Sequence, residues 1–127
     1  LMNSGASLTF DFEESPKVFY SKTYLESIFQ NLLSNAIKYR APDRKLEIHF
    51  KSGTHNGRTY LKVKDNGQGI DMKKHGTKLF GLHKTFHQNK DARGVGLFLT
   101  KTQIETLGGH ISAESVVDEG TTFTIVF

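Results

Sequence analysis

The sequence contains no cysteine and only two prolines among its 127 residues. Without cysteine the chain has neither disulfides nor thiolate metal ligands, which fits a reducing compartment. No apolar run approaches the roughly 20 residues needed to span a bilayer, and no signal peptide opens the chain. We therefore expect a cytoplasmic domain with no direct membrane contact, which leaves open whether a longer parent protein is membrane-anchored.

Positive charge is in slight excess. Lys and Arg number 17 against 13 Asp and Glu, for a net charge of +4. The basic residues are spread along the chain without a dense run, which disfavours nucleic acid as a partner. A small polyanion such as a nucleotide fits the same excess. The length and the hydrophobic fraction of 36% predict a single domain over residues 1–127.

Hydrophobic periodicity predicts the elements of the first half of the chain. Alternating apolar residues indicate a strand at 8–12. An apolar stripe recurring every three to four residues indicates a helix at 23–40. Two further alternating segments, at 46–50 and 61–63, are separated by the turn-forming pair Asn56-Gly57 and predict a hairpin.

The second half begins with a long segment, 66–93, that is rich in Gly, Lys and His and has poor periodicity, so we expect it to be largely irregular with short helices. A loop of this length inside one domain is typical of a functional lid, which we assign to about 70–93. A second helix is expected over 94–107, where Gly108-Gly109 supplies a C-terminal stop. A last hairpin follows, with strands near 111–113 and 123–127.

Every predicted strand has one apolar and one polar face, so helices should cover one face of the sheet and leave the other in water. The expected fold class is α+β. The architecture is a two-layer α/β sandwich with a mixed, mostly antiparallel sheet.

The first candidate site lies on the helix at 23–40. Asn31, Asn35 and Lys38 recur at i, i+4 and i+7 and share one helix face, and Tyr39 follows Asn35 by four residues. Two amides, an ammonium and a phenol beside an apolar stripe favour a ligand site. The alternative is a polar face that water covers.

The second candidate is the segment Asp65-Asn66-Gly67-Gln68-Gly69-Ile70. Asp65 shares the parity of Leu61 and Val63, so its carboxylate should point to the buried face and need a donor, which an adenine amino group would supply. Gly67 and Gly69 would let the backbone approach a flat ring closely. The alternative is an ordinary turn at a strand end.

The third candidate is Gly94-Val95-Gly96-Leu97 at the start of the second helix, preceded by Arg93. Free N–H groups and the helix dipole at such a start favour an anion. A plain helix cap is the alternative. The sequence has no Walker A pattern, no Gly-x-Gly-x-x-Gly fingerprint and no His-Arg-Asp motif, so ATP binding would need another design.

In their order and spacing, these motifs resemble the catalytic ATP-binding domain of sensor histidine kinases, in the superfamily of gyrase B, Hsp90 and MutL. The fold implied is the Bergerat ATP-binding fold. The matching segments are an N box at 31–39, a G1 box at 65–70, a variant F box at 79–86, a G2 box at 94–99 and a closing Gly-Thr-x-Phe signature at 119–123.

The resemblance implies roles around the base. Asp65 would recognise the adenine amino group and Tyr39 would line the ring. The remaining positions implied for nucleotide contact are Gly67, Gly69, Ile70 and Thr122.

Around the phosphates, the resemblance implies that Asn35 binds Mg²⁺, with Asn31 near it. Lys38 and Arg93 would contact phosphate oxygens. The backbone of Gly94, Val95, Gly96 and Leu97 would cradle the triphosphate of ATP.

Asn31 stands where the ATP-hydrolysing members of the superfamily carry a Glu that acts as general base. An amide cannot take a proton, so the site suits phosphoryl transfer to an outside nucleophile better than hydrolysis. Asn31 and Lys38 are the residues we expect to act in that transfer.

In this family the acceptor is a histidine on a dimerisation hairpin upstream of the catalytic domain. None of the six histidines here is followed by Asp or Glu, so that partner domain is expected to lie outside this chain, with a response regulator downstream. The isolated domain should then bind Mg-ATP with little turnover. The alternatives are a degenerate nucleotide-binding module without kinase activity and a self-sufficient ATPase. His83 and His87, spaced i and i+4, lack an evident third metal ligand.

Overall fold

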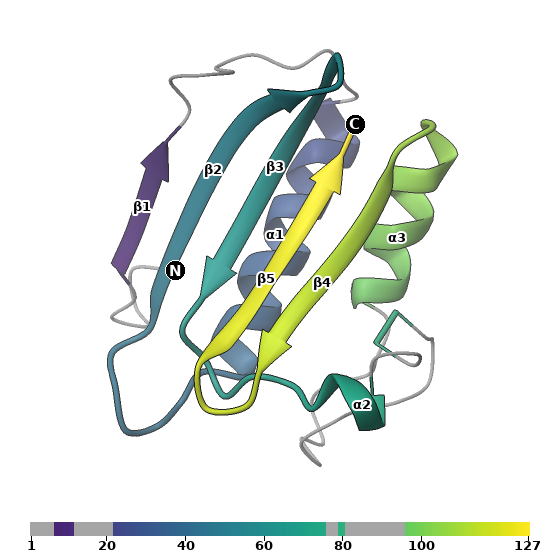
Figure 1. Ribbon diagram of the computed structural model, residues 1–127. Helices are drawn as coiled ribbons and strands as arrows, with labels where there is room; N and C mark the ends of the chain where they lie inside the picture. Colours follow the sequence, from purple (N-terminus) through teal and green to yellow (C-terminus); the bar gives the residue numbers. More distant parts are fainter. Residues whose placement is uncertain (1–6, 12–21, 76–78, 81–95) are drawn as a thin grey trace.

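A computed structural model describes residues 7–11, 22–75, 79–80 and 96–127 of the chain. These residues form five strands and three helices (Figure 1). In chain order they are β1 (Ser7–Asp11), α1 (Lys22–Lys38), β2 (Glu47–His55), β3 (Arg58–Asp65), α2 (Met72–His75), α3 (Gly96–Thr106), β4 (His110–Val116) and β5 (Gly120–Val126).

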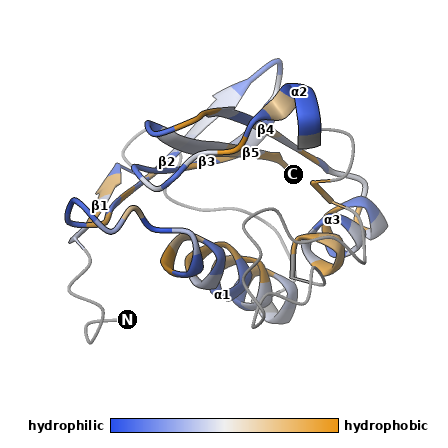
Figure 2. Ribbon diagram, turned by 90° about the horizontal axis from the view of Figure 1, so that it is seen from below, coloured by the Kyte–Doolittle hydropathy of each residue, from blue (hydrophilic) through white to orange (hydrophobic). Residues whose placement is uncertain are grey.

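The strands form one sheet in the order β1-β2-β3-β5-β4. β1 runs parallel to β2, and the other neighbours are antiparallel. α1 and α3 lie side by side on the same face of the sheet (Figure 2). The predicted α+β class and the mixed, mostly antiparallel two-layer architecture are therefore confirmed.

The core lies between the sheet and the two long helices. Along β2 and β3 the buried residues alternate with exposed ones, as a half-buried sheet requires. The helices cover that face with the stripe the sequence predicts. The largest fully buried side chains are those of Phe50, Phe123, Ile28, Leu32, Ile48, Ile104 and Ile125.

Local turn chemistry explains how two of the connections close. Asn56 and Gly57 both have positive φ angles, 52° and 77°, which suit the two-residue hairpin turn between β2 and β3. At the end of α3, Gly108 has φ 86° and its N–H bonds to Glu105 O, while the N–H of Gly109 bonds to Ile104 O. This is the glycine stop that the sequence predicts.

The helix boundaries differ from expectation by one to two residues, and the strands of both hairpins extend up to five residues beyond the expected ranges. α1 begins at Lys22 and ends at Lys38, and α3 begins at Gly96. The last hairpin pairs Val116 with Gly120, so its three-residue loop includes Asp118 at φ 67°. Within the segment expected to be irregular, α2 is a single helical turn.

β1 forms the edge of the sheet. Phe10 stacks on Phe50 with ring centroids 5.1 Å apart although it is 57% exposed. Thr9 Oγ1 and His49 Nδ1 share a hydrogen bond of 2.6 Å on the opposite face. No helix among the described residues is long and apolar enough to cross a membrane.

Candidate functional site

The carboxylate of Asp65 lies at the end of β3, buried to 8% exposure on the face that the helices cover. Its Oδ1 accepts hydrogen bonds from the backbone N–H of Gly67 (2.9 Å) and of Thr121 (3.3 Å). The inward orientation predicted from strand parity is confirmed.

The two hydrogen bonds leave the other oxygen of this carboxylate unused. Among the described residues, none donates to Oδ2 of Asp65. Burial raises the pKa of Asp65 above its usual value, and the N–H groups of Gly67 and Thr121 offset part of that rise. The result is a free acceptor position, among the described residues, on a largely buried carboxylate, which a ligand's N–H group would satisfy.

The loop after Asp65 follows the backbone of its own chain closely. A Cβ on Gly67 would lie 2.7 Å from the carbonyl oxygen of Tyr39 and 3.0 Å from Asp65 Oδ1. Gly69, at φ 74°, faces the backbone of Val116. Within the protein, the close approach that requires glycine is to its own backbone, and the approach of these glycines to a flat ring stays a prediction.

Arg44, which the sequence did not single out, holds this loop in place. Its guanidinium donates to the carbonyls of Asn66 (2.7 Å), Gly67 (2.8 Å) and Asp118 (2.6 Å). It therefore ties the loop after β3 to the turn between β4 and β5. The segment Pro42-Asp43-Arg44-Lys45 gives no sequence signal for such contacts, because the partners of Arg44 are distant backbone carbonyls.

The predicted polar residues Asn31, Asn35 and Lys38 lie on α1 (Lys22–Lys38). Asn31 and Asn35 are half-buried and Lys38 is exposed in the last helical turn. Asn31 Nδ2 donates to Thr100 Oγ1 on α3 at 3.2 Å.

Tyr39 follows α1 directly and connects the helix to the Asp65 loop. Its carbonyl accepts the N–H of Gln68 at 2.9 Å, and its N–H bonds to Asn35 O at 3.1 Å. Its side chain is half-buried, and burial raises the pKa of the phenol.

Two other predicted site residues are buried near the loop and α3. Ile70 is 6% exposed and donates its N–H to Ser115 Oγ at 2.7 Å. Leu97 is 8% exposed in the first turn of α3, which begins at Gly96. The expectations for Arg93, Gly94 and Val95, for most of the lid at 70–93, and for His83 and His87 fall outside the described residues.

The structure does not bring the side chain of Thr122 to Asp65. Thr122 pairs with Lys64 and Glu114, whose side chains lie on the uncovered face. Thr121 is instead the buried neighbour, and its N–H reaches the carboxylate. The period of two in a strand separates these adjacent threonines onto opposite faces.

Metal ligands of the acidic or histidine type are not gathered in the described part of the chain, where no three His, Asp or Glu residues cluster. Asn31 and Asn35 supply amide oxygens instead. Hard cations accept such oxygens, usually together with substrate phosphates and water.

The described residues thus combine a buried carboxylate at a strand end, a glycine loop after it and two amides on the covering helix in a two-layer α+β domain. Residues 21–127 match the family described as "Histidine kinase-, DNA gyrase B-, and HSP90-like ATPase", and the chain belongs to that family.

Named relatives are sensor proteins. The chain is 38% identical over 117 residues to "Sensor protein BceS" of Halalkalibacterium halodurans, covering 90% of this chain and 34% of that protein. It is 30% identical over 114 residues to "Sensor protein RprX" of Bacteroides fragilis, covering 87% of this chain and 22% of that protein. The chain thus spans about a third or less of the length of these relatives.

Solved structures show the same fold. The "Mycobacterial sensor histidine kinase MprB" superposes with a TM-score of 0.83 at 19% identity, covering 99% of this chain and 85% of the other. The nucleotide-free catalytic domain of histidine kinase ThkA superposes with a TM-score of 0.78 at 21% identity, covering 99% and 80%. The fold is therefore that of histidine kinase catalytic domains.

Proposed function

We propose that this domain binds Mg-ATP and transfers the γ-phosphate to a histidine on a separate dimerisation and phosphoacceptor hairpin of the same kinase. The observation that carries the proposal is Asp65, a buried carboxylate with one oxygen held by backbone N–H groups and the other unused by described residues.

Base recognition would centre on this carboxylate. Oδ2 of Asp65 would accept a hydrogen bond from the adenine amino group. The pairing selects adenine because guanine presents a carbonyl oxygen at that position, and two acceptors cannot bond. Tyr39 and Ile70 would line the ring, while Gly67 and Gly69 hold the loop against the backbone. We assign the β5 contact to Thr121, whose N–H orients the carboxylate, in place of Thr122.

Phosphate binding would fall to the end of α1 and the start of α3. Lys38 is exposed in the last turn of α1, where its ammonium can reach a polyphosphate. Backbone N–H groups from Gly94 to Leu97 suit an anion at the helix start. Arg93 completes the proposed phosphate contacts.

Asn31 and Asn35 fit the Mg²⁺ that accompanies ATP. Because Asn31 donates through Nδ2 to Thr100, its Oδ1 is the atom left to face the phosphates. When bound, the ion neutralises phosphate charge and aligns the γ-phosphoryl group. Asn31 provides no general base, so water in the site is not activated and transfer awaits the imidazole of the partner domain.

Several comparisons support this reading beyond the family itself. Named relatives such as "Sensor protein kinase WalK" of Staphylococcus aureus, 31% identical over 104 residues, are sensor kinases. The structure of ShkA, with a TM-score of 0.79, was solved in complex with AMPPNP. We extend the proposal to a response regulator that receives the phosphoryl group from the partner histidine, and to a cytoplasmic location.

Two measurements test the proposal. Calorimetry should detect Mg-ATP binding to the isolated domain, with GTP bound far more weakly. Labelled γ-phosphate should then pass to the histidine hairpin of the parent kinase when that domain is added, while the isolated domain hydrolyses little ATP. Tight binding without transfer would favour a degenerate nucleotide-binding module. Steady hydrolysis of order 1 per second by the isolated domain would identify an ATPase.

A further inference from the structure

The face of the sheet opposite α1 and α3 carries a group of lysines on its two central strands. On β3, Lys62 and Lys64 alternate with the buried residues, and on β2, Lys51 does the same. The register places Lys51 directly opposite Lys62 and His49 opposite Lys64. We call Lys51, Lys62 and Lys64 the basic stripe.

The basic stripe is unfavourable within the fold itself. Like charges directly opposite on neighbouring strands destabilise a sheet. Among the described residues, the ion pair found is that of Arg44 with Asp43, and none involves the stripe. Lys62 Nζ lies 5.8 Å from the ring centre of Tyr60, so its neighbour is an aromatic ring and, among the described residues, no carboxylate pairs with it. An acidic partner from outside this part of the chain would therefore reduce the repulsion between these lysines.

Acidic residues flank the stripe on both sides. Asp11 on β1 pairs with Lys51, and Glu114 lies on the outer strand β4. Between the stripe and Glu114, the same face carries the hydroxyls of Thr122 and Thr124 on β5. The register therefore gives two neighbouring rows across this face, each with an acidic residue at one end. One row is Asp11, Lys51, Lys62, Thr124 and Ser112, and the other is Thr9, His49, Lys64, Thr122 and Glu114.

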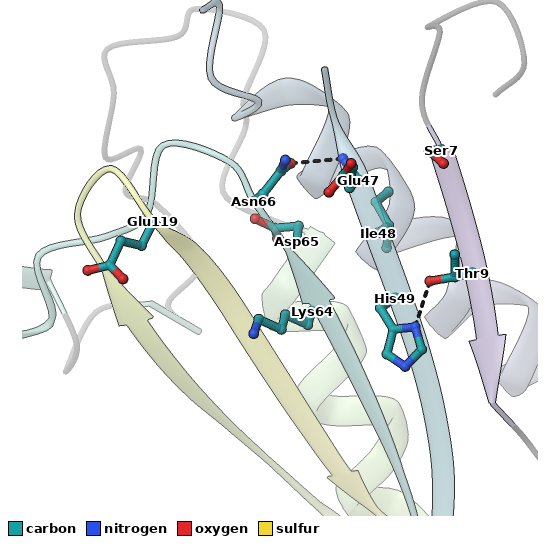
Figure 3. Close-up of a pocket in the computed structure, with 9 residues that line it drawn as sticks. All are labelled: Ser7, Thr9, Glu47, Ile48, His49, Lys64, Asp65, Asn66 and Glu119. Carbon is teal, nitrogen blue, oxygen red and sulfur yellow. Dashed lines mark hydrogen bonds between the residues drawn. The ribbon is translucent and has the colours of Figure 1, made fainter. Parts of the chain in front are cut away.

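A hollow of about 420 Å³ lies at one end of the stripe (Figure 3). Lys64 and His49 line it together with the hydroxyl residues Ser7 and Thr9. Glu47 and Glu119 stand at its border. Asp65 and Asn66 also line the hollow, which therefore lies at the end of β3 that carries the proposed adenine contact.

We propose that the basic stripe is a docking surface for an acidic segment of a protein partner. Side chains two residues apart on an extended chain are about 6.7 Å apart, so alternate carboxylates of an extended segment match the spacing of Lys62 and Lys64. Lys51 lies directly opposite Lys62, so both ammonium groups stand beside the same carboxylate of the segment.

The charge pattern on this face favours a narrow acidic protein segment over a nucleic acid duplex or an anionic membrane. A nucleic acid duplex or an anionic membrane presents negative charge across the whole face, where it meets Asp11, Glu47 and Glu114 as well as the stripe. The aromatic ring of Tyr60, the natural stacking platform on these strands, packs against Gly53 on its own sheet. A narrow acidic segment contacts the stripe and avoids the flanking carboxylates.

The test uses a fluorescein-labelled peptide of alternating Glu and Ser, titrated with this chain while anisotropy is recorded. One variant carries Lys51→Gln, Lys62→Gln and Lys64→Gln. The matched control carries Lys45→Gln, Lys73→Gln and Lys74→Gln, which removes the same charge from exposed lysines elsewhere. We expect about a tenfold loss of peptide affinity in the first variant, equivalent to 1.4 kcal/mol, and little loss in the control.

Further readouts decide between the occupants of this surface. Amide shifts on adding the peptide should concentrate on β2 and β3, binding should weaken with added salt, and ATP affinity should be equal in wild type and the stripe variant. Equal loss of peptide affinity in both variants overturns the proposal, since net charge alone would then explain binding. Tighter binding of duplex DNA or phosphatidylserine vesicles than of the peptide, lost in the stripe variant, also overturns it.

Discussion

Asn31 on α1 and Thr100 on α3 are joined by a hydrogen bond of 3.2 Å from the amide nitrogen to the hydroxyl oxygen. The bond links two helices whose residues are 69 positions apart in sequence. Thr100 is fully buried on α3, so its hydrogen bond fixes the orientation of the Asn31 amide. Through it, the proposed metal ligand on the first helix depends on the helix that follows the predicted lid.

Thr100→Val tests that dependence. The substitution keeps the shape and removes the acceptor, so the free energy of unfolding should fall by about 1 kcal/mol. Freed from Thr100, Asn31 should present its oxygen less often, and the gain in ATP affinity on adding Mg²⁺ should shrink several-fold. Calorimetry with and without Mg²⁺ measures this. Thr102→Val, on the exposed side of the same helix, is the control, and an equal effect there would refute the orientation role.

Asp65→Asn tests base recognition. The asparagine oxygen can still accept from the N–H groups of Gly67 and Thr121, so the fold should survive. Its nitrogen would replace Oδ2 and present a donor to the adenine amino group, which should abolish measurable ATP binding. Circular dichroism checks the fold and calorimetry the affinity. Asp11→Asn on β1 should bind ATP as wild type does, and unchanged affinity in Asp65→Asn would sink the adenine assignment.

The raised pKa of Asp65 predicts a pH dependence of known sign. Between the ordinary carboxyl pKa and the raised native value, the folded protein keeps a proton that the unfolded chain has released. The contribution of Asp65 to the free energy of unfolding therefore falls as pH rises through that window and is constant above it. ATP affinity should rise as pH rises through the same window, because the ionised carboxylate is the better hydrogen-bond acceptor. Denaturant melts and calorimetry against pH should show both trends in wild type and neither in Asp65→Asn.

Arg44→Ala tests the clamp on the loop after β3. Loss of hydrogen bonds to three carbonyls should lower the free energy of unfolding by about 2 kcal/mol, and ATP affinity should weaken because the loop that carries Asp65 loosens. Arg58 is a matched control at the opposite end of the sheet, where it donates to Phe127 O and Gly108 O. Arg58→Ala should lose similar stability but keep ATP affinity. Equal affinities in the two variants would show that Arg44 acts on stability alone.

Gly69→Ala and Gly57→Ala separate backbone strain from close packing. Both glycines have positive φ, but Gly57 faces open space and Gly69 faces the backbone of Val116. Gly57→Ala should cost about 1–2 kcal/mol from strain. Gly69→Ala should cost clearly more, because its Cβ would displace the β4–β5 turn, and it should also weaken ATP binding. Urea denaturation of both variants measures the difference.

Local patterns predicted most of the fold. The apolar stripe of α1, the Asn56-Gly57 turn and the glycines after α3 act over a few residues, and each appears where the sequence indicates. Strand parity also predicted the inward carboxylate of Asp65, since alternation is a property of a single strand.

Local patterns did not predict the contacts between segments that are distant in the sequence. Arg44 reaches carbonyls from two loops, and Ser115 accepts from Ile70, 45 residues away. The choice between Thr121 and Thr122 depends on the register of β5 against β3, which one strand alone does not reveal. The parallel pairing of β1 with β2 likewise follows from tertiary packing.

The two N–H groups that donate to Asp65 belong to residues that are synthesised at different stages, Gly67 early and Thr121 late. Gly67 leaves the ribosome two residues after Asp65, whereas Thr121, Ser115 and the Asp118 carbonyl belong to the last hairpin. A nascent chain that ends after α3 would lack the Thr121 N–H that donates to Asp65. It would also lack the contacts of Ser115 and Asp118 with the loop after β3. Nucleotide affinity should therefore appear late in synthesis, and it can serve as a check that the final hairpin has closed.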